Sequence, residues 1–175
     1  MLTPRERFQR VVTATKAALD IPVLHFEYGH PLVVQEALKK MEGTHAGAAL
    51  RFPMIAVLED VPARGIAPGL SVITPRIIVA MLTQKDHTRE QRQELVFKPV
   101  LWPIVQEFTR QLGRSGVLGT SITSPGTITE RPFWGVEALY GSSGHILDAM
   151  LDCIEISNKE LSIRQAADCA VGTTF

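Results

Sequence analysis

The sequence lacks the features that mark disulfide-stabilised and zinc-stabilised proteins. It contains two cysteines in 175 residues, Cys153 and Cys169, and neither belongs to a Cys-x-x-Cys motif or a Cys/His cluster. A disulfide framework and a structural zinc site are therefore excluded. A single bridge between the two cysteines is the alternative. We expect both thiols to stay reduced, because the N-terminal residues have no apolar stretch of the kind that a secretory signal needs.

The sequence also lacks a long apolar run and an excess of charge of either sign. Its longest run without charged residues, 115–129, is rich in Gly, Ser and Thr, so no membrane span is expected. Lys and Arg together number 18, as do Asp and Glu, which gives a net charge of zero. We therefore expect no membrane partner and no sequence-specific binding of nucleic acid. The length predicts a single domain over residues 1–175.

Capping signals predict the first helix, and a proline begins the second. Thr3 is a favourable N-cap, Pro4 suits the first helical position, and Glu6 completes a capping box. The helix is expected to end near Asp20. A second, shorter helix is predicted over residues 31–41.

A long helix is predicted from Thr88, where Gln91 forms a second capping box. An apolar face recurs at helical spacing as far as Leu112. Pro99 and Pro103 interrupt this pattern, and each removes a backbone donor. We therefore expect a kink near Pro99, or two helical pieces joined there.

Three apolar segments predict strands. Residues 23–28 alternate apolar and polar side chains, whereas 50–60 are apolar on both faces and should lie centrally in a sheet. Residues 70–83 predict a strand antiparallel to 50–60, with Pro75 at a bend. Residues 62–69 contain two prolines and two glycines and are expected to form a loop.

Residues 113–145 form a Gly-rich stretch that we expect to be a long irregular loop region. Order is expected to return at 146–156, followed by a turn and a last short strand over 161–164, with a tail at 165–175. The predicted fold class is therefore α+β. Its small, mostly antiparallel sheet is packed by an N-terminal helix and one long kinked helix.

Five residues are predicted to contact other proteins. Phe133, Trp134 and Tyr140 are aromatic residues in the Gly-rich stretch, and aromatic side chains contribute much of the energy of interfaces. The alternative for these three is that they fold back onto the core. Arg64, in the loop over 62–69, and Phe175, which ends the tail, complete the set.

Catalytic and cofactor signatures are weak, so we predict no enzyme and no cofactor. His25, Glu27 and His30 are the most metal-like cluster, but a site needs further ligands or an open position. Residues 113–119 resemble a phosphate loop without its lysine, and 141–145 lack the spacing of a serine nucleophile. The alternative function is a small metal-binding or ligand-binding enzyme domain that uses the His25 cluster.

Charge is distributed unevenly along the chain. Residues 1–16 are mostly basic, whereas 148–160 are mostly acidic and carry Asp148, Asp152, Glu155 and Glu160 against Lys159. Opposite charges on opposite faces favour head-to-tail contacts between copies, as in a closed ring. The alternative is an ordinary solvated surface.

The order of these elements resembles that of the tail-terminator or tail-completion (neck) proteins of tailed bacteriophages. Three segments carry the resemblance. ALRFPMIAVLE at 49–59 is similar to the family's central strand, TREQR at 88–92 with FKPVLWP at 97–103 to its long helix, and LDCIEISN at 151–158 to its terminal strand. The similarity covers residues 1–112 and 146–164, and 113–144 is longer than the family pattern.

The resemblance implies a virion structural protein that acts without catalysis. Such proteins form a homo-oligomeric ring, usually a hexamer, that caps the tail tube and joins it to the head connector. The implied partners are further copies of the chain, the tail tube protein and the connector or neck proteins. The implied location is the virion tail or neck, after assembly in the host cytoplasm. Another head–tail or baseplate joining protein is the alternative within this class.

Overall fold

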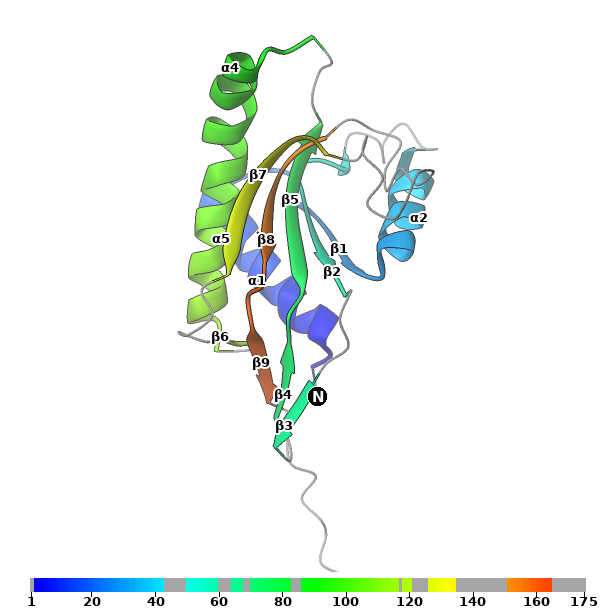
Figure 1. Cartoon of the computed structure of the whole chain (residues 1–175), viewed down its shortest axis with the longest axis vertical. Coiled ribbons are helices and arrows are strands. Elements are labelled where there is room, and N and C mark those ends of the chain that lie inside the picture. The colour runs from blue at the N-terminus through cyan, green and yellow to red at the C-terminus, as the bar shows by residue number, and fades with distance from the viewer. Residues whose placement is uncertain are drawn as a thin grey trace, which may run out of the picture.

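A mixed five-stranded sheet lies at the centre of the molecule, and helices pack on both of its faces (Figure 1). The computed structural model describes residues 2–42, 50–59, 64–67, 70–82, 86–116, 118–120, 126–134 and 151–164. The helical segments are α1 (Pro4–Leu19), α2 (Pro31–Glu42), α4 (Arg89–Arg92), the π-helix η1 (Gln93–Leu101) and α5 (Trp102–Arg114). The strands are β1 (His25–Gly29), β2 (Met54–Leu58), β3 (Arg64–Ala67), β4 (Leu70–Ile73), β5 (Arg76–Leu82), β6 (Gly119–Thr120), β7 (Thr127–Trp134), β8 (Leu151–Ser157) and β9 (Leu161–Arg164).

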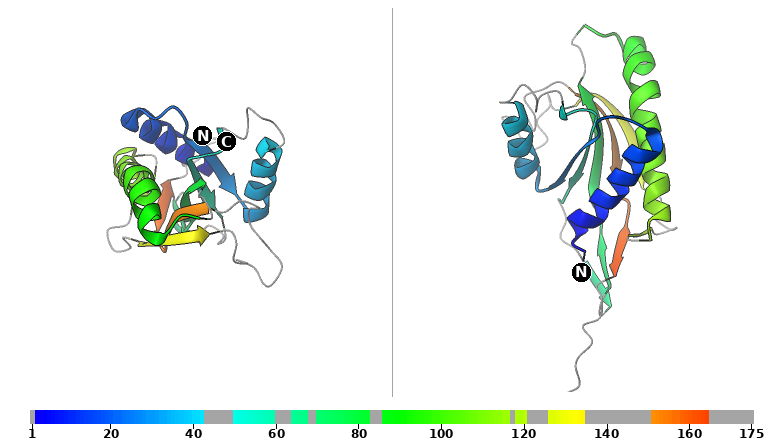
Figure 2. Two further views of the ribbon diagram at one scale, coloured as in Figure 1. Left: turned by 90° about the horizontal axis from the view of Figure 1, so that it is seen from above. Right: turned by 180° about the vertical axis from the view of Figure 1, so that it is seen from behind.

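The strands form two sheets, and both agree with the predicted α+β class. The larger has the order β1-β2-β5-β8-β7, and the smaller has the order β3-β4-β9-β6. In the larger sheet β1 and β2 are parallel and every other pair is antiparallel. The smaller sheet projects from one end of the larger, beyond the N-terminus of α1 (Figures 1 and 2).

Both predicted capping boxes are present. In α1 the Glu6 N–H donates to Thr3 Oγ1 over 3.3 Å, and the Thr3 N–H donates to Glu6 Oε2 over 2.7 Å. Asp20, with a φ of 52°, ends this helix in the left-handed region. Thr88 and Gln91 make the same pair of bonds at the start of α4. These local hydrogen bonds satisfy amide donors that a helix start leaves unpaired.

The long helix accommodates its prolines by widening. The predicted irregularity near Pro99 takes the form of η1, a π-helical segment between α4 and α5. The Trp102 N–H, for example, donates to the Phe97 carbonyl, five residues earlier. Since Pro99 has no N–H and its ring crowds the preceding turn, a regular α-helix is disfavoured there.

The predicted positions of the central strands are confirmed. All five residues of β2 are buried, and β2 lies between β1 and β5. Pro75 separates β4 from β5, so that the predicted single strand over 70–83 contributes to both sheets. The predicted turn before the last strand is also present, because Asn158 has a φ of 56° between β8 and β9. β8 and β9 do not pair with each other, since each joins a different sheet.

Two segments predicted as loops contain strands. Within the predicted irregular region 113–145, β7 is an eight-residue strand paired with β8, and β6 pairs with β9. Within the predicted loop 62–69, β3 pairs with β4. The Thr, Ile and aromatic residues of β7 favour a strand, and its antiparallel partner supplies the hydrogen bonds that a local pattern does not reveal.

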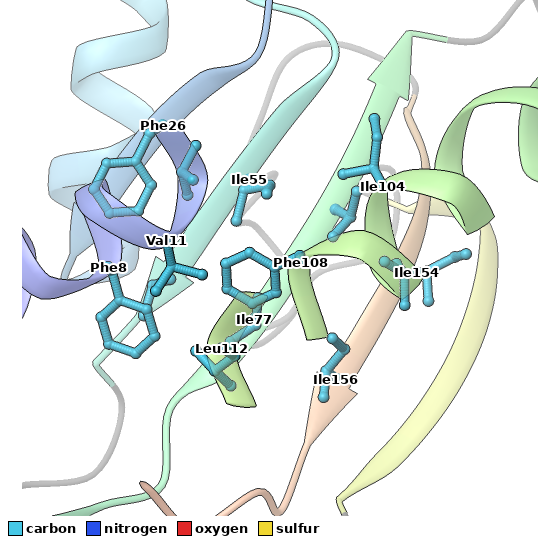
Figure 3. Packing of buried hydrophobic residues seen from close by; sticks show 14 of the residues in the cluster. Phe8, Val11, Phe26, Ile55, Ile77, Ile104, Phe108, Leu112, Ile154 and Ile156 are labelled. Carbon is cyan, nitrogen blue, oxygen red and sulfur yellow. The ribbon is translucent and has the colours of Figure 1, made fainter. Parts of the chain in front are cut away.

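The core divides between the two faces of the larger sheet. On one face, α1, η1 and α5 pack against the strands, and Phe8, Val11, Phe108 and Leu112 meet strand residues such as Ile77 (Figure 3). We call this the helical face. On the other face, Val34 and Leu38 of α2 belong to a second cluster of buried residues. The first cluster joins the sheet to α1, η1 and α5. β7 and β1 are the two edge strands of this sheet.

Candidate interaction surface

The predicted interface residues fall at the edges of the two sheets or outside the described residues. Phe133 and Trp134 end β7, the edge strand of the larger sheet, and Trp134 pairs with Leu151 of β8. Arg64 begins β3, an edge strand of the smaller sheet. Tyr140 and Phe175 lie outside the described residues, as does the predicted tail over 165–175. The two sheets thus keep Arg64 apart from the Phe133–Trp134 pair.

β7 is one of the two edge strands of the larger sheet, and its residues Thr127, Ile128, Arg131 and Pro132 are exposed. Within the described ranges it pairs with β8 alone, and its Ile128 side chain is 46% exposed although it lies on the helical face. The register is regular from Thr127 to Arg131, and a bulge separates Arg131 from Trp134. Pro132 falls in this bulge and has no N–H to donate. The regular part of the edge therefore ends at Arg131.

Side chains from the long helix fix β7 in place. On the helical face, Glu130 accepts hydrogen bonds from Trp102 Nε1 over 2.6 Å and from Gln93 Nε2 over 2.7 Å. A carboxylate that receives two donors is held more firmly than a neutral acceptor. The edge strand is therefore attached to the body of the molecule by side chains as well as by its ladder with β8.

On the opposite face of the sheet, Glu155 joins three neighbouring strands. The Glu155 carboxylate on β8 accepts a hydrogen bond from Arg76 Nε on β5 over 3.0 Å, and a second from Arg131 Nε on β7. Its side chain is 5% exposed, whereas that of Arg131 is 50% exposed. The two arginines compensate the buried charge of Glu155. One of them, Arg131, lies on β7, an edge strand of the sheet.

Another buried ion pair attaches the start of the long helix to β8. Arg92 Nη1 contacts both carboxylate oxygens of Asp152, at 2.9 and 3.0 Å. Arg92 Nε also donates to the His87 carbonyl over 3.1 Å. The side chains of Arg92 and Asp152 are 2% and 0% exposed. Two buried charges of opposite sign are stable here because they are hydrogen-bonded to each other.

These ion pairs correct the predicted charge asymmetry. Asp152 and Glu155 were expected to form an acidic face, but both are buried and bonded to arginines of the same chain. Asp148 lies outside the described residues. Contacts between copies therefore cannot rest on Asp152 and Glu155, because their charges are already compensated.

The structure does not assemble a metal site from the predicted histidines. His25 Nε2 lies 3.0 Å from Glu27 Oε1, while His30 Nδ1 accepts a hydrogen bond from the Leu32 N–H over 3.3 Å. Glu27 also lies 3.8 Å from Arg5. In the described parts of the chain, no group of three His, Cys, Asp or Glu side chains is arranged to hold a metal ion. The two histidines thus serve different contacts.

The other two weak motifs gain no support as sites. Residues 113–116 follow or end α5, and Gly116 has a φ of 62°, so this glycine supports a turn after the helix. A phosphate loop instead connects a strand to a following helix. The segment 141–145 lies outside the described residues.

Cys153 is buried between Glu155 and Leu151 on β8, and Cys169 lies outside the described residues. Burial, and secondarily the nearby Glu155 carboxylate, raises the pKa of the Cys153 thiol. This thiol therefore stays protonated in the folded state at pH values where an unfolded thiol, with a pKa of about 8.5, ionises.

Because the folded pKa of Cys153 is the higher one, its contribution to stability is complete below about pH 8 and declines as the pH rises further. We expect the unfolding free energy to fall more steeply from pH 8 to pH 10 in the wild type than in Cys153→Ala. Urea denaturation at a series of pH values measures both slopes. Equal slopes would contradict the raised pKa of Cys153. Cys169 is present in both proteins, so its contribution does not affect the difference between the slopes.

Comparison of the chain with protein-family models and with curated proteins finds no match. Of the helices that the structure describes, none combines the length and the hydropathy needed to cross a bilayer.

Sequence reasoning did not find the residues that secure the β7 edge. Glu130, Gln93 and Trp102 are far apart in the sequence, and their contacts follow from the packing of η1 and α5 beside β7. The local composition was a signal for a strand, because Thr127, Ile128 and Thr129 are β-branched residues. That composition favours a strand but does not identify its neighbours.

Proposed function

We propose that this chain is a virion structural protein, a tail-terminator or neck-ring subunit. Copies of it form a ring, most simply a hexamer, that caps the tail tube and joins it to the head connector without catalysis. The observation that carries the proposal is the edge strand β7, which pairs with a single described strand and ends in Phe133 and Trp134. An open strand edge is a template for pairing with another chain.

Two further features support a role in assembly. The smaller sheet, with Arg64 on its edge strand β3, projects beyond one end of the larger sheet (Figure 1). Hydrogen bonds of Glu130 and Glu155 attach β7 to the rest of the molecule on opposite faces of the sheet. A preorganised edge binds a partner at a lower cost in conformational entropy than a flexible one.

The proposal predicts a concentration-dependent ring. Native mass spectrometry and light scattering, from low to high micromolar protein, should detect a closed oligomer, and added protein should stop the elongation of polymerising tail tubes. A monomer at every concentration that leaves tube length unchanged would contradict the proposal.

Trp134→Ala should weaken the oligomer about tenfold or more, since truncated aromatic anchors often cost at least that much. Leu95→Ala is the matched control, because Leu95 is an apolar side chain, 57% exposed, that lies on η1 and so outside both edge strands of the larger sheet. If both variants assemble like the wild type, Trp134 is not an anchor of the ring.

A further inference from the structure

Assuming the ring of the proposed function, we propose that β7 of one copy pairs antiparallel with β1 of the next copy. The occupant of the open β7 edge is thus a second copy of this chain, and each five-stranded sheet continues into its neighbour. β7 and β1 are the two edge strands of the larger sheet, and each pairs with one strand only within the described ranges.

Strand direction supports this pairing. β1 runs parallel to β2, and each of the steps from β2 to β5, from β5 to β8 and from β8 to β7 reverses direction. β7 therefore runs opposite to β1. A rotation about an axis along the strands preserves their directions, so it brings β7 against the neighbouring β1 in antiparallel orientation. Such head-to-tail contacts are the kind that close a ring.

The two edges also match in length. The regular part of β7 covers Thr127 to Arg131 and is limited by the bulge and Pro132. β1 has five residues, His25 to Gly29. Aligning the two stretches end to end places Thr129 opposite Glu27 of the next copy. Pairing of equal length leaves neither edge with unpaired backbone groups along the contact.

The faces of the two strands agree in this register. Ile128 lies on the helical face, as does Tyr28, whose ring centroid lies 5.9 Å from that of Phe8. Ile128 would therefore oppose Tyr28 of the next copy, and a β-branched residue opposite an aromatic one is a favourable cross-strand pair. A register shifted by one residue would put these side chains on opposite faces.

Charge favours the same register. Arg131 and Glu27 lie on the face opposite the helical one. The register places Arg131, which keeps its hydrogen bond to Glu155, directly opposite His25 and diagonal to Glu27, the residue that His25 contacts. Arg131 is 50% exposed. The contact between Glu27 and Arg5 is 3.8 Å long and the Arg5 side chain is 58% exposed, so Arg5 can move aside at little cost. Opposite charges at such diagonal positions stabilise the pairing.

Disulfide trapping tests the pairing. In a Cys169→Ser background, Ile128→Cys combined with Tyr28→Cys should form disulfides between copies under mild oxidation, giving a ladder of covalent oligomers up to the size of the ring. Thr129→Cys with Glu27→Cys is a second pair on the opposite face, in case loss of the Tyr28 side chain impairs folding. Ile128→Cys with Glu27→Cys is the matched control, because these side chains lie on opposite faces and should remain unlinked.

The outcomes separate the pairing from the ring itself. A ring by native mass without a ladder from either matched pair would overturn the β7–β1 pairing and leave the proposed function standing. Cross-linking of Thr129→Cys alone into dimers would also overturn it, because that result requires two β7 strands side by side. A monomer at every concentration that also leaves tube length unchanged would overturn the proposed function and, with it, the pairing.

Discussion

Replacing Asp152 with alanine is expected to lower the free energy of unfolding by about 3–5 kcal/mol, the usual cost of removing one partner from a buried ion pair. The substitution leaves the Arg92 guanidinium, 2% exposed, without the carboxylate that contacts it at 2.9 and 3.0 Å. The hydrogen bond from Arg92 Nε to the His87 carbonyl does not compensate a full charge. Urea denaturation monitored by circular dichroism measures the effect.

Two further variants test whether the loss of stability in Asp152→Ala comes from the unpaired charge of Arg92. Arg92→Met together with Asp152→Leu removes both charges and should recover most of the lost stability, because a well-packed apolar pair is often as stable as a buried ion pair. Arg89→Met changes an exposed arginine on the same helix and should alter stability by no more than about 0.5 kcal/mol. An Asp152→Ala variant as stable as Arg89→Met would show that the ion pair contributes nothing.

The same ion pair shows what the sequence could not predict. The sequence separates Arg92 from Asp152 by 60 residues, and it separates Arg76 from Glu155 by 79. Asp152 and Glu155 lie close together in the sequence, which therefore predicts an acidic surface. Strand pairing brings Arg76 and Arg131 to Glu155, and the packing of the long helix brings Arg92 to Asp152, so the burial of these carboxylates is a tertiary property.

Local signals predicted local structure well. The capping boxes at Thr3 and Thr88 are satisfied by residues three positions away, and the apolar run of β2 is confirmed as a buried strand. β3 and β7 were missed because glycine and proline surround or interrupt them, and because each is held by pairing with another strand. The α+β class could thus be predicted, but the division into two sheets could not.

The candidate site divides in the same way. Phe133 and Trp134 could be singled out because aromatic residues are unusual in a Gly-rich stretch, but their place at a sheet edge depends on β8. The His25 cluster was predicted from spacing, yet His30 turns to the start of α2 and bonds to the Leu32 amide. Spacing along a strand determines that His25 and Glu27 lie on one face of it. Whether His30 reaches the same site depends on the turn that follows the strand.

Phe108→Ala is expected to lower the free energy of unfolding by about 3–5 kcal/mol, because it removes a large apolar side chain and leaves a cavity. Phe108 on α5 is 0% exposed and packs in the cluster that joins α1 and α5 to the sheet (Figure 3). Thr109→Ala, at the exposed next position, is the control and should stay within about 0.5 kcal/mol of the wild type. Equal effects of the two substitutions in urea denaturation would contradict this packing.

The Phe108 variant also separates core stability from contacts between copies. Phe108 projects from α5 into the cluster between the helices and the sheet and is part of neither edge strand, so Phe108→Ala should lower the stability of the folded subunit without changing the residues that meet in a ring. At a temperature where the variant is still folded, the Ile128→Cys and Tyr28→Cys cross-link should therefore form as in the parent. Loss of the cross-link in folded protein would mean that the helical layer sets the geometry of the edge. In that case the cavity would weaken assembly through the hydrogen bonds of Glu130 to Trp102 and Gln93.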